Sequence, residues 1–189
     1  MVTSSDCSTW KEPRNLRKVP ALFLTVDPSI VVGAQQGDAI ALDQLLDELA
    51  PYVRWLCASV APEVVDDATQ EALTAIFRNL RRLRAPEAIL SWARVITVRA
   101  AMEAVREAGR DQVGVDVAER RDDRARPEEL VDVADALRRI PRELRVVLVL
   151  RQIEGMSERE VAHALKLPVG TVKSRLHRAR VTFREVWSR

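Results

Sequence analysis

Residues 157–187 read SEREVAHALKLPVGTVKSRLHRARVTFREVW, and this stretch decides the fold at the C-terminal end of the chain. Ser157 is a good helix N-cap, and Glu160 three residues later completes a capping box. Pro168 follows Leu167 and ends that helix, because proline cannot donate the backbone hydrogen bond that a helix interior requires. Proline is also well suited to the first position of a new helix. The sequence therefore predicts two helices joined by a tight turn.

The second of these helices has an apolar side and a basic side. The apolar residues recur at steps of three and four: Val169, Val172, Leu176, Ala179, Phe183 and Val186. The other side carries the basic residues Lys173, Arg175, His177, Arg178, Arg180 and Arg184. A capped apolar helix, a turn and a basic helix together favour insertion into a DNA major groove. Basic amphipathic helices also bind membranes and acidic partners, but here the apolar stripe is needed to pack on the preceding helix.

Composition favours an all-α fold. The chain has 189 residues, 47% of them hydrophobic but only 4% aromatic, so its cores are built from aliphatic side chains. Such cores are typical of small helical bundles. Only six glycines occur, and no segment shows the alternation of a half-buried strand, which argues against an extensive sheet.

Charge is distributed unevenly along the chain. Between Asp27 and Glu71 there are nine acidic residues and a single basic one, Arg54. Between Arg78 and Arg106 there are seven arginines and two glutamates. This pattern indicates a protein-facing surface next to a surface that faces nucleic acid.

Cysteine usage and hydropathy argue against a disulfide-rich, metal-binding, membrane or secreted protein. The two cysteines, Cys7 and Cys57, form no CxxC pair and have no histidine cluster nearby, so we expect no disulfide framework, metal site or cofactor. Cys57 is expected to be a small core residue. No segment has the length of a transmembrane helix, and the N-terminal stretch lacks the features of a signal peptide, so we expect a cytoplasmic protein without a membrane partner.

Breaks in the apolar pattern divide the chain into four segments. Residues 1–26 are expected to be a poorly ordered extension, and residues 27–110 a first domain with helices at 30–35, 39–60, 64–83 and 89–108. Residues 111–127 are the third segment. From Arg110 to Pro127 five arginines balance five acidic residues and no apolar period occurs, as in a flexible linker. Residues 128–189 then form a second small domain with helices at 130–140, 143–153, 157–166 and 168–188.

This order of elements resembles the extracytoplasmic-function sigma factors of the bacterial sigma-70 family. The most specific match is IPRELRVVLVLRQIEGMSEREVAHALKLPVGTVKSRLHRAR, which is similar to region 4 of that family. Gly37-Asp38, residues 67–71 and residues 92–96 resemble region 2. The resemblance implies two helical domains, region 2 and region 4, joined by a flexible linker that runs through the active-site cleft of RNA polymerase. It also implies a factor that binds core polymerase, directs it to promoters and helps to melt the −10 element, without being an enzyme.

The resemblance further implies a role for particular residues. Asp67, Gln70 and Glu71 resemble the residues that dock region 2 on the clamp helices of the largest polymerase subunit, while region 4 faces the polymerase flap. Arg94, Arg99 and Arg106 are candidates for contact with the backbone of the melted −10 strand. The candidates for −35 recognition are Gly170, Thr171, Lys173, Ser174, Arg175 and Arg178. The chain departs from the family at Arg99, where asparagine is usual, and at Glu103, where aspartate is usual.

Two other functions are weighed against this one, and one regulatory partner alongside it. A stand-alone helix-turn-helix regulator would share the C-terminal helices but would not need polymerase. An enzyme that uses Asp66, Asp67 and Glu71 as metal ligands is disfavoured, because these residues share one helix and have no identifiable partner elsewhere. An anti-sigma protein that wedges between the two domains regulates many members of the family, and the resemblance allows such a partner for this chain.

Overall fold

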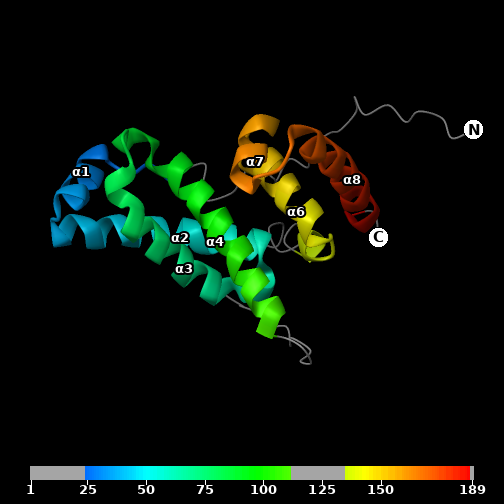
Figure 1. Cartoon of the computed structure of the whole chain (residues 1–189), viewed down its shortest axis with the longest axis horizontal. Coiled ribbons are helices and arrows are strands. Elements are labelled where there is room, and N and C mark those ends of the chain that lie inside the picture. The colour runs from blue at the N-terminus through cyan, green and yellow to red at the C-terminus, as the bar shows by residue number, and fades with distance from the viewer. Residues whose placement is uncertain (1–23, 112–134, 188–189) are drawn as a thin grey trace, which may run out of the picture.

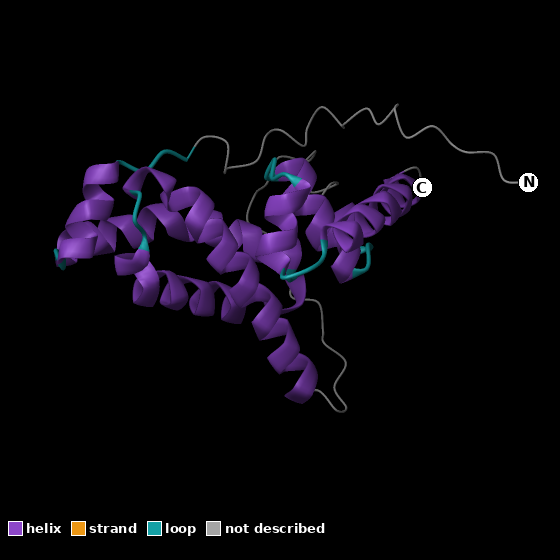
Figure 2. Cartoon of the chain, turned by 45° about the horizontal axis from the view of Figure 1, so that its top comes forward, coloured by secondary structure: helices purple, strands orange, loops and turns teal. Residues whose placement is uncertain are grey.

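The computed structural model describes residues 24–111 and 135–187, and all regular structure within these two ranges is helical (Figures 1 and 2). The first range contains α1 (Pro28–Gln36), α2 (Ala39–Val60), α3 (Val65–Asn79) and α4 (Ile89–Asp111). Short 3-10 turns connect them: η3 (Pro62–Val64), η4 (Leu80–Arg82) and η5 (Pro86–Ala88). The second range contains α6 (Arg142–Leu148), the π-helical segment η6 (Val149–Ile153), α7 (Glu158–Leu165) and α8 (Val169–Trp187), preceded by a helical turn at 135–138. The prediction of an all-α fold is confirmed.

The break between α1 and α2 forms for local reasons. Gly37 ends α1 with a φ of 94°, a left-handed conformation that glycine adopts without steric cost. Asp38 caps α2, because its carboxylate accepts hydrogen bonds from the backbone nitrogens of Ile40 at 2.9 Å and Ala41 at 3.2 Å. The two helices approach closely at Gly33, where an added Cβ would lie 3.0 Å from the Cβ of Ala41.

The core of the first helical group lies between α2, α3 and α4. Small side chains on α3 and α4, such as Ala72 and Ala101, are fully buried and let these two helices pack against each other at short range. The larger core side chains come mostly from α2, including Leu45, Leu49 and Leu56. The segment predicted as one helix over 64–83 is instead α3 flanked by the 3-10 turns η3 and η4, since the last turn of a helix often tightens in this way.

In the second group, α8 packs across α6 and α7 (Figure 1). The buried face of α8 consists of Val172, Leu176, Ala179 and Phe183, as the spacing predicts. Val169 was expected on the same face but is 37% exposed, because it is the first residue of the helix and precedes the part that packs on α7.

The two helical groups are in contact. Helix α4 packs on α7, and α2 packs on α6 (Figure 1). Leu24 and Val26, the end of the predicted extension, also pack against the core. The predicted linker starts at 111, but α4 continues to Asp111, and the rest of the linker lies outside the described residues.

Candidate polymerase and promoter interfaces

Helices α7 and α8 form the predicted helix-turn-helix. Both hydrogen bonds of the capping box are present: the Ser157 nitrogen donates to Glu160 Oε2 at 2.6 Å, and the Glu160 nitrogen donates to Ser157 Oγ at 3.2 Å. The side-chain and backbone hydrogen bonds from Ser157 lower the pKa of Glu160 below its usual value. Lys166 closes α7 in the left-handed conformation, with a φ of 53°. Pro168 immediately precedes the first helical residue of α8, and its carbonyl accepts the first backbone hydrogen bonds of that helix.

The N-terminal half of α8 presents most of the predicted −35 residues to solvent. Lys173, Ser174 and Arg178 are exposed, and Thr171 is half-buried. At Gly170 an added Cβ would meet open space, so nothing on the protein side keeps another backbone or a phosphate from approaching it. These groups lie on the outward side of a helix whose opposite side is buried, as a helix that enters a groove requires.

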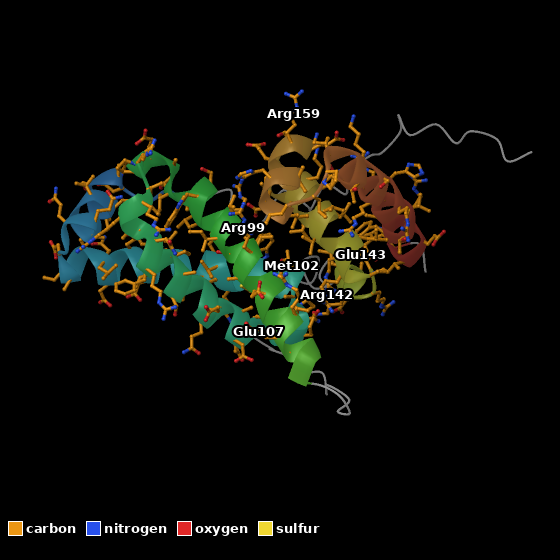
Figure 3. All side chains as sticks on the ribbon, viewed as in Figure 1. Arg99, Met102, Glu107, Arg142, Glu143 and Arg159 are labelled. Carbon is orange, nitrogen blue, oxygen red and sulfur yellow. The ribbon has the colours of Figure 1, made fainter. Side chains whose placement is uncertain are left out.

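Two basic residues of α8 are held by acidic neighbours in the same helical group. Arg175 Nη2 lies 3.1 Å from Glu143 Oε2 of α6, and the Arg175 side chain is only 28% exposed. Lys173 Nζ lies 3.9 Å from Glu158 Oε2 of α7. Figure 3 shows Glu143 on α6, next to α8. Surface ion pairs of this kind contribute little free energy, so both basic side chains can change partners at small cost.

The predicted polymerase-docking residues lie on one exposed face of α3. Asp67, Gln70 and Glu71 are all exposed, while Ala68, Ala72 and Ile76 on the opposite face are fully buried. Two turns beyond Gln70 the exposed face continues to Phe77, a residue that is 53% exposed. The sequence analysis did not identify Phe77 as part of this face, although its spacing of seven residues from Gln70, two helical turns, aligns it with that residue.

The three arginines predicted for the −10 element have different surroundings. Arg106 is exposed, forms an ion pair with Glu103 and donates a hydrogen bond to the Met102 carbonyl oxygen at 3.3 Å. Arg94 and Arg99 instead point from α4 toward the C-terminal helices (Figure 3 for Arg99). The structure thus brings these two residues to the contact between the helical groups and leaves Arg106 on the surface.

A buried carboxylate takes part in this contact. Glu154 follows η6, and its side chain has 0% exposure. Its Oε2 lies 2.5 Å from Arg94 Nε and accepts a hydrogen bond from the Tyr52 hydroxyl at 2.9 Å. Burial raises the pKa of Glu154, and the neighbouring Arg94 guanidinium offsets part of the rise. The local sequence around Glu154 does not indicate that it binds Tyr52, because Tyr52 is 102 residues away in the chain.

The described residues offer no metal site or membrane span. Within 24–111 and 135–187, the acidic, histidine and cysteine side chains form no group of three that could hold a metal ion. Over the same residues, every helix is too short or too polar to cross a membrane. Cys57 is fully buried, as expected of a core residue, and burial raises its pKa to about 11.

Comparisons with known proteins agree with the geometry. A family model described as sigma-70, region 4 matches residues 130–183. The ECF RNA polymerase sigma-E factor of Haemophilus influenzae is 29% identical over 172 residues, which cover 82% of this chain and 91% of the relative. The sigma-E factor of Escherichia coli is 31% identical over 173 residues, covering 82% and 90%. The ECF sigma factor SigM of Mycobacterium tuberculosis is 32% identical over 158 residues, covering 82% and 81%.

Two solved structures have a similar fold. One is CnrH in complex with the cytosolic domain of CnrY, with a TM-score of 0.57 and 25% identity over 86% of this chain and 97% of that one. The other is the sigma factor RpoE of Bartonella quintana in complex with the anti-sigma factor NepR, with a TM-score of 0.61 and 22% identity over 77% and 96%. The arrangement of helices, the matched region 4 and relatives above 30% identity that are matched over nearly their whole length lead to one conclusion. The chain belongs to the extracytoplasmic-function RNA polymerase sigma factors of the sigma-70 family.

Proposed function

We propose that this sigma factor binds core RNA polymerase through the exposed face of α3 and presents promoter DNA to α4 and α8. Residues 27–110 serve as region 2 and residues 128–189 as region 4, with residues 111–127 as the linker that threads the polymerase cleft. The observation that carries the proposal is the capped helix-turn-helix whose second helix exposes Lys173, Ser174 and Arg178 near its N-terminus.

Docking on the polymerase is assigned to Asp67, Gln70 and Glu71. These side chains are exposed on a helix whose other face is anchored in the core, so a partner can contact them without unfolding the domain. Polar and acidic side chains suit a polar coiled-coil surface such as the clamp helices, and the exposed Phe77 adds apolar area at the end of the same face.

Promoter contacts are divided between the two helical groups. Gly170, Thr171, Lys173, Ser174, Arg175 and Arg178 are assigned to the −35 element, with Arg175 released from Glu143 when DNA binds. Arg106 is already exposed and suits a contact with the backbone of the melted −10 strand. Arg94 and Arg99 can join it only after the helical groups separate, because both now bind groups on the C-terminal side.

A regulatory protein partner is also part of the proposal. CnrH was solved in complex with the cytosolic domain of CnrY, and RpoE of Bartonella quintana in complex with an anti-sigma factor. We assign to this chain a partner of the anti-sigma class that competes with core polymerase for the exposed face of α3.

Transcription with purified components tests the proposal. Core polymerase is mixed with the chain and a library of promoter fragments, and the 5′ ends of the transcripts are mapped. Dependence of defined start sites on the chain, together with its coelution with core enzyme, supports the proposal. Specific binding of DNA by a chain that neither coelutes with core polymerase nor directs start sites would identify a stand-alone regulator instead.

A further inference from the structure

Among the described residues, three groups of polar contacts join the two helical groups. The first consists of Arg99 and the C-terminal end of α7, and the second of Arg94, Tyr52 and Glu154. In the third, Glu63 of η3 binds two arginines of α6. Each of these contacts spans a large separation in the chain, so each exists only while the two groups are packed together. Figure 3 shows Arg99 on α4 and Arg142 at the start of α6.

Arg99 acts as a cap for α7. Its Nε donates a hydrogen bond to the carbonyl oxygen of Ala164 at 3.1 Å, and its Nη2 donates to that of His163 at 3.0 Å. The last carbonyls of a helix lack partners within the helix and carry the negative end of its dipole. A guanidinium is therefore well matched to this site. The usual family residue at this position, asparagine, is too short and carries no charge.

Arg94 holds the second group of contacts. The buried Glu154 carboxylate binds Arg94 Nε at 2.5 Å, and the Tyr52 hydroxyl bridges the same two side chains, 3.2 Å from Arg94 Nε. Glu154 Oε1 is also buried and has no hydrogen-bond partner among the described residues. This unsatisfied oxygen is a cost of bringing the groups together, since water would bind it if they separated. The contact is therefore specific without being strongly stabilising.

Glu63 supplies the third group. Its carboxylate lies 2.9 Å from Arg142 Nε and 3.3 Å from Arg145 Nη2, and the same Arg145 atom donates to the Val60 carbonyl oxygen at 3.3 Å. The Arg145 side chain is only 6% exposed, so burial lowers its pKa. These contacts orient α6 against the end of α2.

We propose that these contacts form an intramolecular latch in which Glu154 and the C-terminal carbonyls of α7 occupy, on Arg94 and Arg99, the places that DNA phosphates take at the −10 element. The proposal rests on the assignment of both arginines to −10 DNA in the proposed function, and it adds a regulation of that site. The free chain is closed, and closing competes directly with capture of the −10 strand. Separation of the helical groups frees both arginines in one step.

The chemistry of the groups that bind Arg94 and Arg99 in the closed chain supports competition with DNA rather than mere proximity. A carboxylate and helix C-terminal carbonyls are oxygen acceptors with negative charge or partial negative charge, as phosphate oxygens are. The latch leaves the outward residues of α8 untouched, since Lys173, Ser174 and Arg178 remain exposed in the closed chain. Closing therefore masks the −10 side of the molecule and leaves the −35 side accessible.

The test removes two acidic residues of the latch, neither of which is assigned to promoter or polymerase contact. The double variant Glu63→Gln/Glu154→Gln removes both acidic partners and keeps Arg94 and Arg99 intact. The matched control is Glu107→Gln/Asp135→Asn, which removes the same charge from an exposed and a half-buried position, one in each helical group. Asp135 pairs within its own group, with Arg138 at 2.9 Å. Circular dichroism checks that both variants keep the helical content of the wild type.

Two readouts use the free full-length chain. In small-angle X-ray scattering, the radius of gyration should rise in the latch variant and stay at the wild-type value in the control. In fluorescence anisotropy with labelled oligothymidine dT20, the latch variant should bind about tenfold more tightly than the wild type, because apparent affinity scales with the fraction of open chain. Addition of dT20 to the wild type should also raise its radius of gyration.

Three results would overturn the latch. The first is an unchanged radius of gyration together with a dT20 affinity equal to that of the control. The second is an equal gain of affinity in the control, which would mean that lost charge alone is responsible. The third concerns Tyr52→Phe, which keeps the ring that stacks on Trp55 and removes only the hydroxyl. This variant should show a smaller rise in radius of gyration and dT20 affinity than the double variant. No change in either quantity would contradict the latch, even if the double variant unfolds.

The outcome for the latch is separable from that for the proposed function. The latch variant should direct core polymerase to the same start sites as the wild type, because every assigned contact residue is retained. A wild-type chain that fails to direct start sites overturns the proposed function, whatever the scattering shows. A chain that directs start sites but has the same dimensions with and without Glu63 and Glu154 overturns the latch alone.

Discussion

Arg94 Nε lies 2.5 Å from Oε2 of Glu154, a carboxylate that is fully buried between the two helical groups of the chain. Removing one member of such a pair leaves the other buried without a partner, which costs far more than the net value of the pair. We therefore expect Arg94→Ala to lower the free energy of unfolding by up to about 3 kcal/mol. The loss cannot exceed the free energy that holds the two helical groups together, because once they separate, water reaches Glu154.

Urea denaturation followed by circular dichroism measures this effect. Arg106→Ala is the control, since Arg106 is exposed and its pair with Glu103 on the same helix is worth less than about 1 kcal/mol. Equal losses in the two variants would mean that the buried pair does not hold the helical groups together.

The docking assignment predicts that charge reversal on α3 prevents assembly with polymerase. Glu71→Lys, alone or with Gln70→Lys, should abolish coelution with core enzyme while helical content is kept, because both side chains are exposed and oppose the buried Ala72. Asp47→Lys on the exposed side of α2 makes the same change of charge and should assemble normally. Normal affinity of the Glu71 variants for core enzyme would place the docking face elsewhere.

Recognition of the −35 element should depend on Arg175. Arg175→Ala should weaken binding to a −35 duplex by about 1–3 kcal/mol if the side chain reaches a base edge. Glu143→Gln should strengthen the same binding slightly, because it releases Arg175 from the ion pair at 3.1 Å. Anisotropy titrations with matched and mismatched duplexes measure both effects, and coelution with core polymerase should be unchanged. An unaltered affinity and base preference for Arg175→Ala would remove this residue from the recognition surface.

The capping box predicts a pH-dependent contribution to the stability of α7. Hydrogen bonds from Ser157 lower the pKa of Glu160, so its stabilisation is present above the pKa of the unfolded chain and is lost as the pH falls through the lower folded value. Urea denaturation should therefore show that Glu160→Gln is less stable than the wild type at neutral pH, and that the difference shrinks in acid. Ser157→Ala should cost about 1 kcal/mol at neutral pH. A difference that is constant with pH would mean that the carboxylate does not contribute to the cap.

Cys57 should be nearly inert in the folded chain. Burial raises its pKa to about 11 from a reference of 9.0, so at pH 8 its thiolate population falls by about two orders of magnitude. In a Cys7→Ser background, iodoacetamide should modify Cys57 slowly in buffer and rapidly in denaturing urea, as followed by mass spectrometry. Fast modification in buffer would show that the contact of α2 with α3 opens readily.

Much of the architecture could be predicted because its signals are local. The capping box at Ser157, the proline at 168 and the Gly37-Asp38 break act through hydrogen bonds and backbone geometry within a few residues, so they can be identified in the sequence itself. The buried face of α8 follows from its three- and four-residue spacing, and so does the exposed face of α3 that carries Gln70. Val169 was placed wrongly because spacing cannot tell where along a helix its packing against a neighbour begins.

The sequence by itself determined an all-helical chain and the helix-turn-helix, while the surfaces assigned to polymerase and DNA stay predictions. Only the tertiary structure decided what Arg94 and Arg99 bind in the free chain. Their partners, Glu154 and the carbonyls of His163 and Ala164, belong to helices that are remote in sequence. A spacing pattern shows which side of a helix is polar. The identity of the opposing group depends on how the helices pack, and that is set by the summed burial of many apolar side chains from both groups.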